Sequence, residues 1–227
     1  MNDSPGTSPD PATPTPHPGS VESRPSNWNV PNALTVFRIL LVPVFLWLLL
    51  ARGTEDVGFH VWALVVFLAA MATDKLDGDI ARKYGLVTDF GKIADPIADK
   101  GLMAAALLGL AVLGILPWWV PVVILVRELG ITVMRFVIIR YVVLPASKGG
   151  KLKTVLQTVA LGLFLLWIPL GAVIDGAAFL TYAVIAWVAM AAAILVTVLT
   201  GLDYVVQAAR RVAAAKSTGT DPDAEVP

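Results

Sequence analysis

Residues 177–202 read AAFLTYAVIAWVAMAAAILVTVLTGL and contain no charged side chain. An α-helix rises about 1.5 Å per residue, so about 20 apolar residues cross the hydrocarbon core of a bilayer. The whole chain agrees with this interpretation, because 57% of its 227 residues are apolar, against about 45–50% in soluble domains. These features predict an integral membrane protein.

Five further apolar segments precede this one. The six predicted transmembrane helices cover residues 33–51, 58–81, 91–115, 118–143, 152–173 and 177–202. The uncharged run 101–126 is divided by Leu116-Pro117-Trp118-Trp119, because a proline followed by interfacial tryptophans marks a turn at the membrane surface. The predicted fold class is therefore all-α, an integral membrane bundle of six transmembrane helices.

The two ends of the chain have a different composition. Residues 1–27 hold seven of the 16 prolines and few bulky apolar side chains. Such a segment cannot bury enough surface to offset the chain entropy lost on folding. We predict disordered tails over residues 1–27 and 212–227, and a single membrane domain over residues 28–211.

Basic side chains in the predicted connections gather on one side of the membrane. On the other side the only such residue is Arg52. Cytoplasmic connections carry the excess of Lys and Arg, so we expect a cell-membrane protein whose two termini are both cytoplasmic. The residues on the basic side are Arg82, Lys83, Lys92, Arg140, Lys148, Lys151, Lys153, Arg210, Arg211 and Lys216.

The chain has no Cys and only two His. This excludes disulfides, a thiol nucleophile and cysteine-ligated zinc or iron–sulfur sites, and it leaves little material for a histidine-rich metal centre. Any metal bound here must be held mainly by oxygen ligands.

Acidic side chains are concentrated in DKLDGDIARKYGLVTDFGKIADPIAD, residues 74–99, which hold six of the eleven acids of the predicted membrane domain. Charge at this depth is costly and indicates a function or a partner. Asp74 and Asp77 are three residues apart, and Asp95 and Asp99 four apart, so each pair shares one face of a helix. The short connection between the two helices predicts antiparallel neighbours, with four carboxylates converging across one gap.

Four carboxylates in one gap would repel one another unless cations bound between them. An oxygen-only site beside open space favours Mg²⁺ or Mn²⁺, which bind a few carboxylates together with phosphate oxygens of a substrate. Two such ions could hold the attacking and leaving oxygens of a displacement at phosphorus. The small residues Gly78, Ala81 and Gly91 would let a diphosphate approach the backbone, although such residues are equally typical of contacts between membrane helices.

From Asp74 to Asp99 the chain reads D-x2-D-G-x2-A-R-x8-G-x3-D-x3-D. This string resembles the signature of the CDP-alcohol phosphatidyltransferase family at all eight of its fixed positions. The resemblance implies a six-helix membrane enzyme, usually a homodimer. Such an enzyme moves a phosphatidyl group from CDP-diacylglycerol to an alcohol and releases CMP.

The resemblance also implies roles for individual residues. Two ions of Mg²⁺ or Mn²⁺ would be bound by the carboxylates of Asp74, Asp77, Asp95 and Asp99. The catalytic base would be Asp99. The residues around the nucleotide would be Gly78, Ala81 and Arg82.

Two further stretches bear on the acceptor alcohol. Residues 29–38, NVPNALTVFR, and residues 127–157 resemble the phosphatidylglycerophosphate synthases within the family. The resemblance implies sn-glycerol 3-phosphate as acceptor. The other expected partners of the protein are membrane lipids, and no nucleic acid is expected. Basic residues near the aspartates are suited to its phosphate, although basic loops also bind lipid headgroups. The candidates are Arg135, Lys151, Lys148, Lys153 and Arg127.

Several alternatives stay open at this point. Arg127 and Glu128 could instead pair between helices, and Thr35 and Arg38 could touch substrate, or Arg38 could extend to the membrane surface. A phosphatidylinositol phosphate synthase of the same family would need a similar basic pocket. A divalent-cation transporter could also place aspartates inside a helical bundle, but nearer the midplane and without small residues at fixed offsets.

Overall fold

The computed structural model describes residues 30–84, 88–138 and 148–217, and within α2 the side chains of residues 75–83 are not described. These residues form helices and no strand. The helices are α1 (Val30–Leu50), α2 (Val57–Tyr84), α3 (Asp89–Val112), α4 (Trp119–Ile138), α5 (Lys148–Leu165), α6 (Trp167–Gly171) and α7 (Gly176–Ser217). The prediction of an all-α fold is confirmed for this part of the chain.

Each of the six predicted segments coincides with a long helix. The segment 152–173 covers the long helix α5 and also the short helix α6. Three stretches are apolar and long enough to cross a membrane, namely Asn32–Leu50, Val57–Asp74 and Gly176–Arg211, and a shorter apolar helix covers Leu152–Leu165. These helices make the chain an integral membrane protein. The α7 helix extends to Ser217, and so reaches into the first residues of the predicted C-terminal tail.

The predicted helix over residues 152–173 is interrupted. It ends as α5 at Leu165 and resumes as α6 at Trp167. Pro169 explains the interruption, because its nitrogen carries no hydrogen for the carbonyl of Leu165 and its ring clashes with that carbonyl. One turn earlier, the hydroxyl of Tyr182 on α7 donates a hydrogen bond to the carbonyl of Leu163.

The turn predicted around residues 116–119 is confirmed. The connection between α3 and α4 begins with Gly114 at φ +72°, a conformation that glycine adopts without strain. The amides of Ile115 and Leu116 both donate to the carbonyl of Leu110, at 3.0 and 3.1 Å. The turn thereby places Leu116 in the core, while Trp118 and Trp119 stay exposed.

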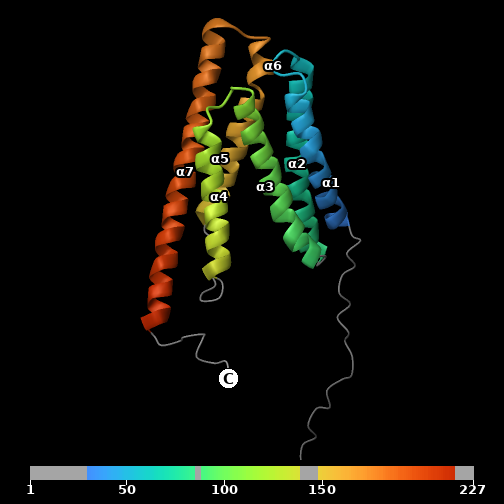
Figure 1. Cartoon of the computed structure of the whole chain (residues 1–227). Helices are drawn as coiled ribbons and strands as arrows, with labels where there is room; N and C mark the ends of the chain where they lie inside the picture. The colour runs from blue at the N-terminus through green and yellow to red at the C-terminus, as the bar shows by residue number, and fades with distance from the viewer. Residues whose placement is uncertain (1–29, 85–87, 139–147, 218–227) are drawn as a thin grey trace, which may run out of the picture.

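The helices form two groups that meet near the α3–α4 connection and diverge toward the end at which α1 begins (Figure 1). One group holds α1, α2 and α3, with α1 packed along both of the others. The other holds α4, α5 and α7. Direct contact between α2 and α3 is small, so the two acidic helices are joined mainly through α1.

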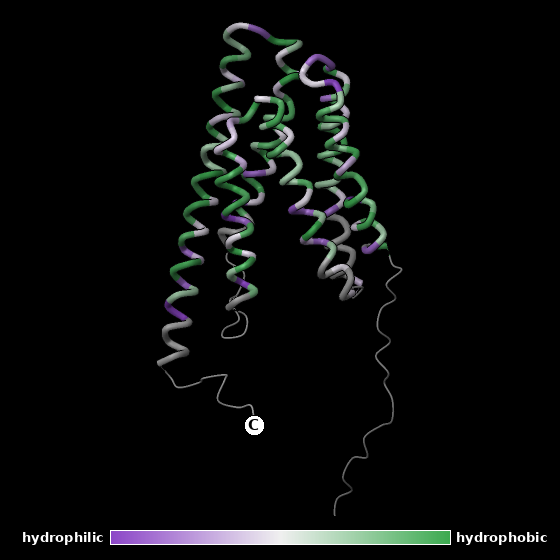
Figure 2. Tube along the Cα trace, in the orientation of Figure 1, coloured by the Kyte–Doolittle hydropathy of each residue, from purple (hydrophilic) through white to green (hydrophobic). Residues whose placement is uncertain are grey.

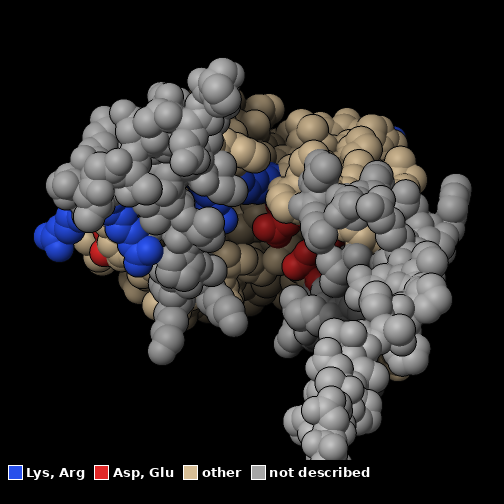
Figure 3. Space-filling model, turned by 90° about the horizontal axis from the view of Figure 1, so that it is seen from below, with Lys and Arg blue, Asp and Glu red and all other residues tan. Residues whose placement is uncertain are grey.

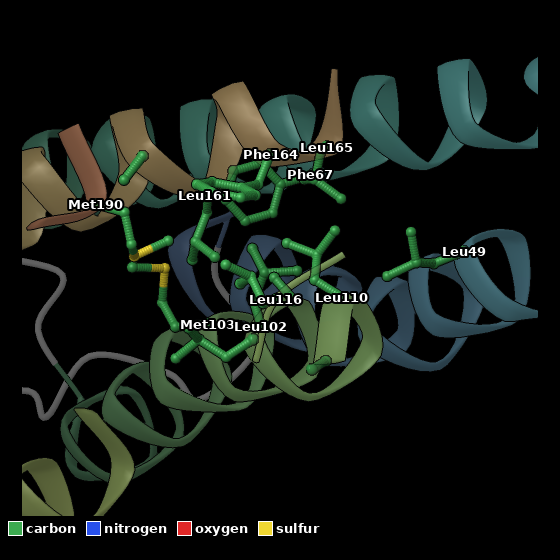
Figure 4. Packing of buried hydrophobic residues seen from close by; sticks show 14 of the residues in the cluster. Leu49, Phe67, Leu102, Met103, Leu110, Leu116, Leu161, Phe164, Leu165 and Met190 are labelled. Atoms are coloured by element: carbon green, nitrogen blue, oxygen red, sulfur yellow. The ribbon is translucent and has the colours of Figure 1, made fainter. Parts of the chain in front are cut away.

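The core lies where the two groups meet. Figure 4 shows Phe67 of α2, Leu110 of α3 and Phe164 of α5 gathered at its centre, with Met190 of α7 and Leu49 of α1 toward its two ends. The exterior is apolar as well, and Figure 2 shows hydrophobic residues along most of the length of the helices, with hydrophilic residues nearer the two ends. An apolar core together with an apolar exterior is the pattern of a bundle surrounded by lipid.

Candidate active site

Two buried polar side chains of α1 hold aspartates of the neighbouring helices. Arg38 Nη1 donates to Asp74 Oδ1 on α2 at 2.6 Å, and Thr35 Oγ1 donates to Asp95 Oδ1 on α3 at 2.5 Å. Arg38 and Thr35 are each 1% exposed. Of the two alternatives for Arg38, the structure excludes extension to the membrane surface, because the side chain is buried and its guanidinium pairs with the carboxylate of Asp74.

The beginning of α3 is fixed to α1 by a third contact. Thr88 caps the helix by accepting a hydrogen bond from the amide of Gly91 at 3.1 Å, and its hydroxyl donates to Asn32 Oδ1 at 2.9 Å. A Cβ atom on Gly91 would lie 3.0 Å from that oxygen and 3.9 Å from Asp95 Oδ2. Gly91 therefore allows α1 to approach α3 closely and keeps the space beside Asp95 open.

Sequence reasoning did not single out Asn32, and it did not pair Thr35 and Arg38 with aspartates. A signal was present, because the three residues follow one another at intervals of three and so lie on one side of α1. That side faces the acidic residues of α2 and α3.

Asp99 on α3 lies among charged side chains of three other helices. Its charge interacts with those of Asp74 on α2, Arg38 on α1 and Lys153 on α5. The convergence of all four aspartates stays a prediction. The side chain of the predicted metal ligand Asp77 lies outside the described residues. The same holds for the surroundings of the predicted nucleotide-binding residues Gly78, Ala81 and Arg82.

The described donors have the chemistry that Mg²⁺ or Mn²⁺ requires. Among the side chains that the structure describes, no three acidic, Cys or His residues form a metal cluster. Asp74 and Asp95 each have one oxygen engaged by α1, which leaves the second oxygen for a ligand. Asp74 is 40% exposed. Together with Asp99 and the predicted ligand Asp77, these oxygen donors fit a hard divalent cation.

A cavity of about 210 Å³, lined in part by Asp99, lies between α3, α4 and α5. Its polar lining residues are Asp99, Lys100, Glu128, Lys153, Thr154 and Gln157. The remaining lining is apolar, from α3 and α4. Seen from the end at which α1 begins, acidic and basic atoms face each other across a hollow between the helices (Figure 3).

The basic residues predicted for the acceptor phosphate are placed differently from one another. Lys153 is buried, lines the cavity and forms an ion pair with Glu128 Oε1. Arg135 is exposed and lies over the ring of Tyr204, with its Cζ atom 5.7 Å from the ring centre. The side chains of Lys148 and Lys151 lie outside the described residues.

Arg127 is directed toward α7. It donates to Glu128 Oε1 at 2.9 Å, to the carbonyl of Thr197 at 3.0 Å and to Thr200 Oγ1 at 2.9 Å. A Cβ atom on Gly201 would lie 3.1 Å from two atoms of the Arg127 side chain. The structure thus favours the alternative in which Arg127 joins helices, and Gly201 provides the space for it.

Comparison with known proteins agrees with the signature at residues 74–99. Residues 28–199 match the CDP-alcohol phosphatidyltransferase family. A probable phosphatidylglycerophosphate synthase of Mycobacterium tuberculosis is 48% identical over 205 residues, which cover 90% of this chain and 93% of that protein.

Two further relatives are more distant. A CDP-diacylglycerol–glycerol-3-phosphate 3-phosphatidyltransferase of Bacillus subtilis is 40% identical over 61% of this chain and 77% of its own. A cardiolipin synthase (CMP-forming) of Streptomyces coelicolor is 34% identical over 66% of this chain and 73% of its own. The chain described here belongs to the CDP-alcohol phosphatidyltransferase family.

Proposed function

We propose that this protein transfers the phosphatidyl group of CDP-diacylglycerol to sn-glycerol 3-phosphate, giving phosphatidylglycerophosphate and CMP. The observation that carries the proposal is the position of Asp99. It lies within reach of the charge of Asp74, and it also lines the cavity that holds Lys153. This position, next to the acidic residues and at a cavity that contains a cation, supports a role of Asp99 as the proton acceptor. The Mycobacterium tuberculosis relative, a probable phosphatidylglycerophosphate synthase, supports the same reaction.

In the proposed reaction, Lys153 binds the phosphate of the acceptor and so places its primary hydroxyl near Asp99. Asp99 accepts the proton of that hydroxyl. The oxygen then forms a bond to the lipid-side phosphorus of CDP-diacylglycerol, and the bond from that phosphorus to the oxygen of CMP breaks. Mg²⁺ or Mn²⁺ held by Asp74, Asp77, Asp95 and Asp99 would supply neutralisation of the diphosphate charge when bound.

The other residues of the signature have proposed roles around the donor. Gly78, Ala81 and Arg82 would contact the nucleotide, since they follow the first two aspartates on α2. Arg38 and Thr35 would hold Asp74 and Asp95 in place, because they bond to one oxygen of each. The reaction would thus rest on positioning and on neutralisation of charge.

We further propose six transmembrane helices, a homodimer, and an active site on the cytoplasmic side together with both termini. The excess of Lys and Arg in the connections on that side supports the orientation. The beginning of α1 and the end of α7 lie at the same end of the bundle (Figure 1). This is the arrangement expected of an even number of crossings.

The deciding experiment is an acceptor panel with the purified protein in detergent. CDP-diacylglycerol and Mg²⁺ or Mn²⁺ are combined with sn-glycerol 3-phosphate, inositol phosphate, phosphatidylglycerol or plain glycerol, and both CMP and the lipid product are measured. We expect efficient turnover with sn-glycerol 3-phosphate alone, and none after chelation of the metal. A preference for inositol phosphate or phosphatidylglycerol would assign a different acceptor within the family.

A further inference from the structure

Glu128 has no part in the mechanism above, although it lines the same cavity as Asp99 and Lys153. Its side chain is 21% exposed, and donors on two sides hold it in place. Arg127 Nη1 donates to it at 2.9 Å, and Lys153 Nζ forms an ion pair with it. Arg127 is itself bonded to α7, so the position of Glu128 is fixed by three helices.

Both of these bonds end on the same atom of Glu128, the oxygen Oε1. The other oxygen, Oε2, accepts no hydrogen bond from any residue that the structure describes. An ionised carboxylate can only accept hydrogen bonds, and Glu128 lines the cavity. The cavity therefore presents an acceptor that is suited to a hydroxyl group of a ligand.

The acceptor in the proposed function has two hydroxyl groups on adjacent carbons. Asp99 takes the proton of the reacting hydroxyl, and the phosphate is bound by Lys153. The second hydroxyl still needs a hydrogen-bond acceptor in the cavity. Glu128 is in direct contact with Lys153 and lines the same cavity as Asp99, so its carboxylate borders the space into which the acceptor would bind.

We infer that Glu128 is a specificity-determining residue, whose Oε2 accepts a hydrogen bond from the hydroxyl next to the reacting one. This contact selects phosphorylated acceptors that have two hydroxyl groups on adjacent carbons over those that have only the reacting hydroxyl. The inference rests on the proposed function and adds to it a reason why the neighbouring hydroxyl matters.

The test compares sn-glycerol 3-phosphate with 3-hydroxypropyl phosphate, which lacks only the second hydroxyl. Loss of one hydrogen bond to a charged group lowers kcat/KM by about 10- to 150-fold. We therefore expect wild-type protein to prefer sn-glycerol 3-phosphate by about that factor in kcat/KM. No preference in the wild type would overturn the inference while leaving the proposed function intact.

The Glu128→Gln variant makes the test specific. Arg127 and Lys153 can only donate hydrogen bonds, so they bind the amide oxygen and leave the NH₂ group in the place of Oε2. The cavity then presents a donor instead of an acceptor. We expect the preference between the two substrates to fall several-fold below that of the wild type, because the ligand hydroxyl can at best accept a weaker, neutral hydrogen bond from the amide.

A merely structural role of Glu128 would lower kcat/KM for both substrates alike and keep their ratio, and that result would overturn the inference. Asp203→Asn is the matched control, since Asp203 is an exposed carboxylate on α7 that bonds Gln207; its ratio should equal that of the wild type. If Glu128→Gln does not fold, Glu128→Asp retains the charge but retracts it, and an unchanged ratio in that variant contradicts the inference. A wild-type protein that makes no lipid from sn-glycerol 3-phosphate overturns both proposals.

Discussion

Replacement of Arg38 tests whether α1 organises the active site. The Arg38→Met variant removes the guanidinium but keeps an apolar chain of similar length, so the buried space stays filled. Removal of one partner of a buried ion pair destabilises a protein by about 3–5 kcal/mol. Asp74, however, is 40% exposed, so water can solvate its carboxylate once Arg38 is replaced. The loss should therefore be closer to that of one charge-assisted hydrogen bond, about 1.5–3 kcal/mol.

If that contact serves to place Asp74 for the reaction, the same free energy appears as a decrease of about 10- to 150-fold in kcat/KM. The assay measures CMP release at varied CDP-diacylglycerol, together with thermal unfolding of the variant in detergent. Arg52→Met is the matched control, because Arg52 is exposed in the α1–α2 connection, where its guanidinium lies over the ring of Phe59. Retention of more than half of the wild-type kcat/KM by a folded Arg38→Met protein would refute the reasoning.

Three further changes test other parts of the site and the fold. Asp99→Asn should lower kcat by at least 100-fold, because it removes the base but keeps the side-chain volume; activity within tenfold of wild type in the CMP assay contradicts that role. Lys153→Ala should raise the KM for sn-glycerol 3-phosphate by about 10- to 150-fold and leave the KM for CDP-diacylglycerol unchanged, since Glu128 keeps its bond to Arg127; equal changes in both KM values would count against a phosphate contact. Gly109→Ala should destabilise the fold by about 1–3 kcal/mol, because its Cβ atom would lie 2.5 Å from Leu49 Cδ2 in the core, and an unchanged unfolding temperature would show that Leu49 can move aside.

The helices were predictable from the sequence because each one is marked by a long stretch of apolar residues, and such a stretch is a local property of the chain. The interruption at Leu166 was missed, although Pro169 marks it, since a run of apolar residues hides a proline near its end. The contacts of α1 with the acidic helices were also missed. Hydropathy shows that residues 30–50 form a helix, but it does not show which helix packs between two others.

The site was predictable only as far as its residues stand in one motif. Asp74, Asp95 and Asp99 were found because their spacing is regular. Arg127 and Lys153 have the same charge and belong to the same set of predicted acceptor residues, yet one bonds α7 and the other lines the cavity. That difference depends on the direction of each side chain from its helix, which is set by packing among α4, α5 and α7.

The pairing of Arg38 with Asp74 also bears on how the chain enters the membrane. The two residues are 36 positions apart, so a ribosome completes α1 before the carboxylate that neutralises its arginine has been made. An unpaired arginine within a bilayer is costly, so we expect α1 alone to be unstable at its final depth. We expect its insertion to be completed when α2 arrives, with the first two helices integrating as a hairpin. The ion pair between Arg38 and Asp74 would then also bear on the earliest steps in biogenesis.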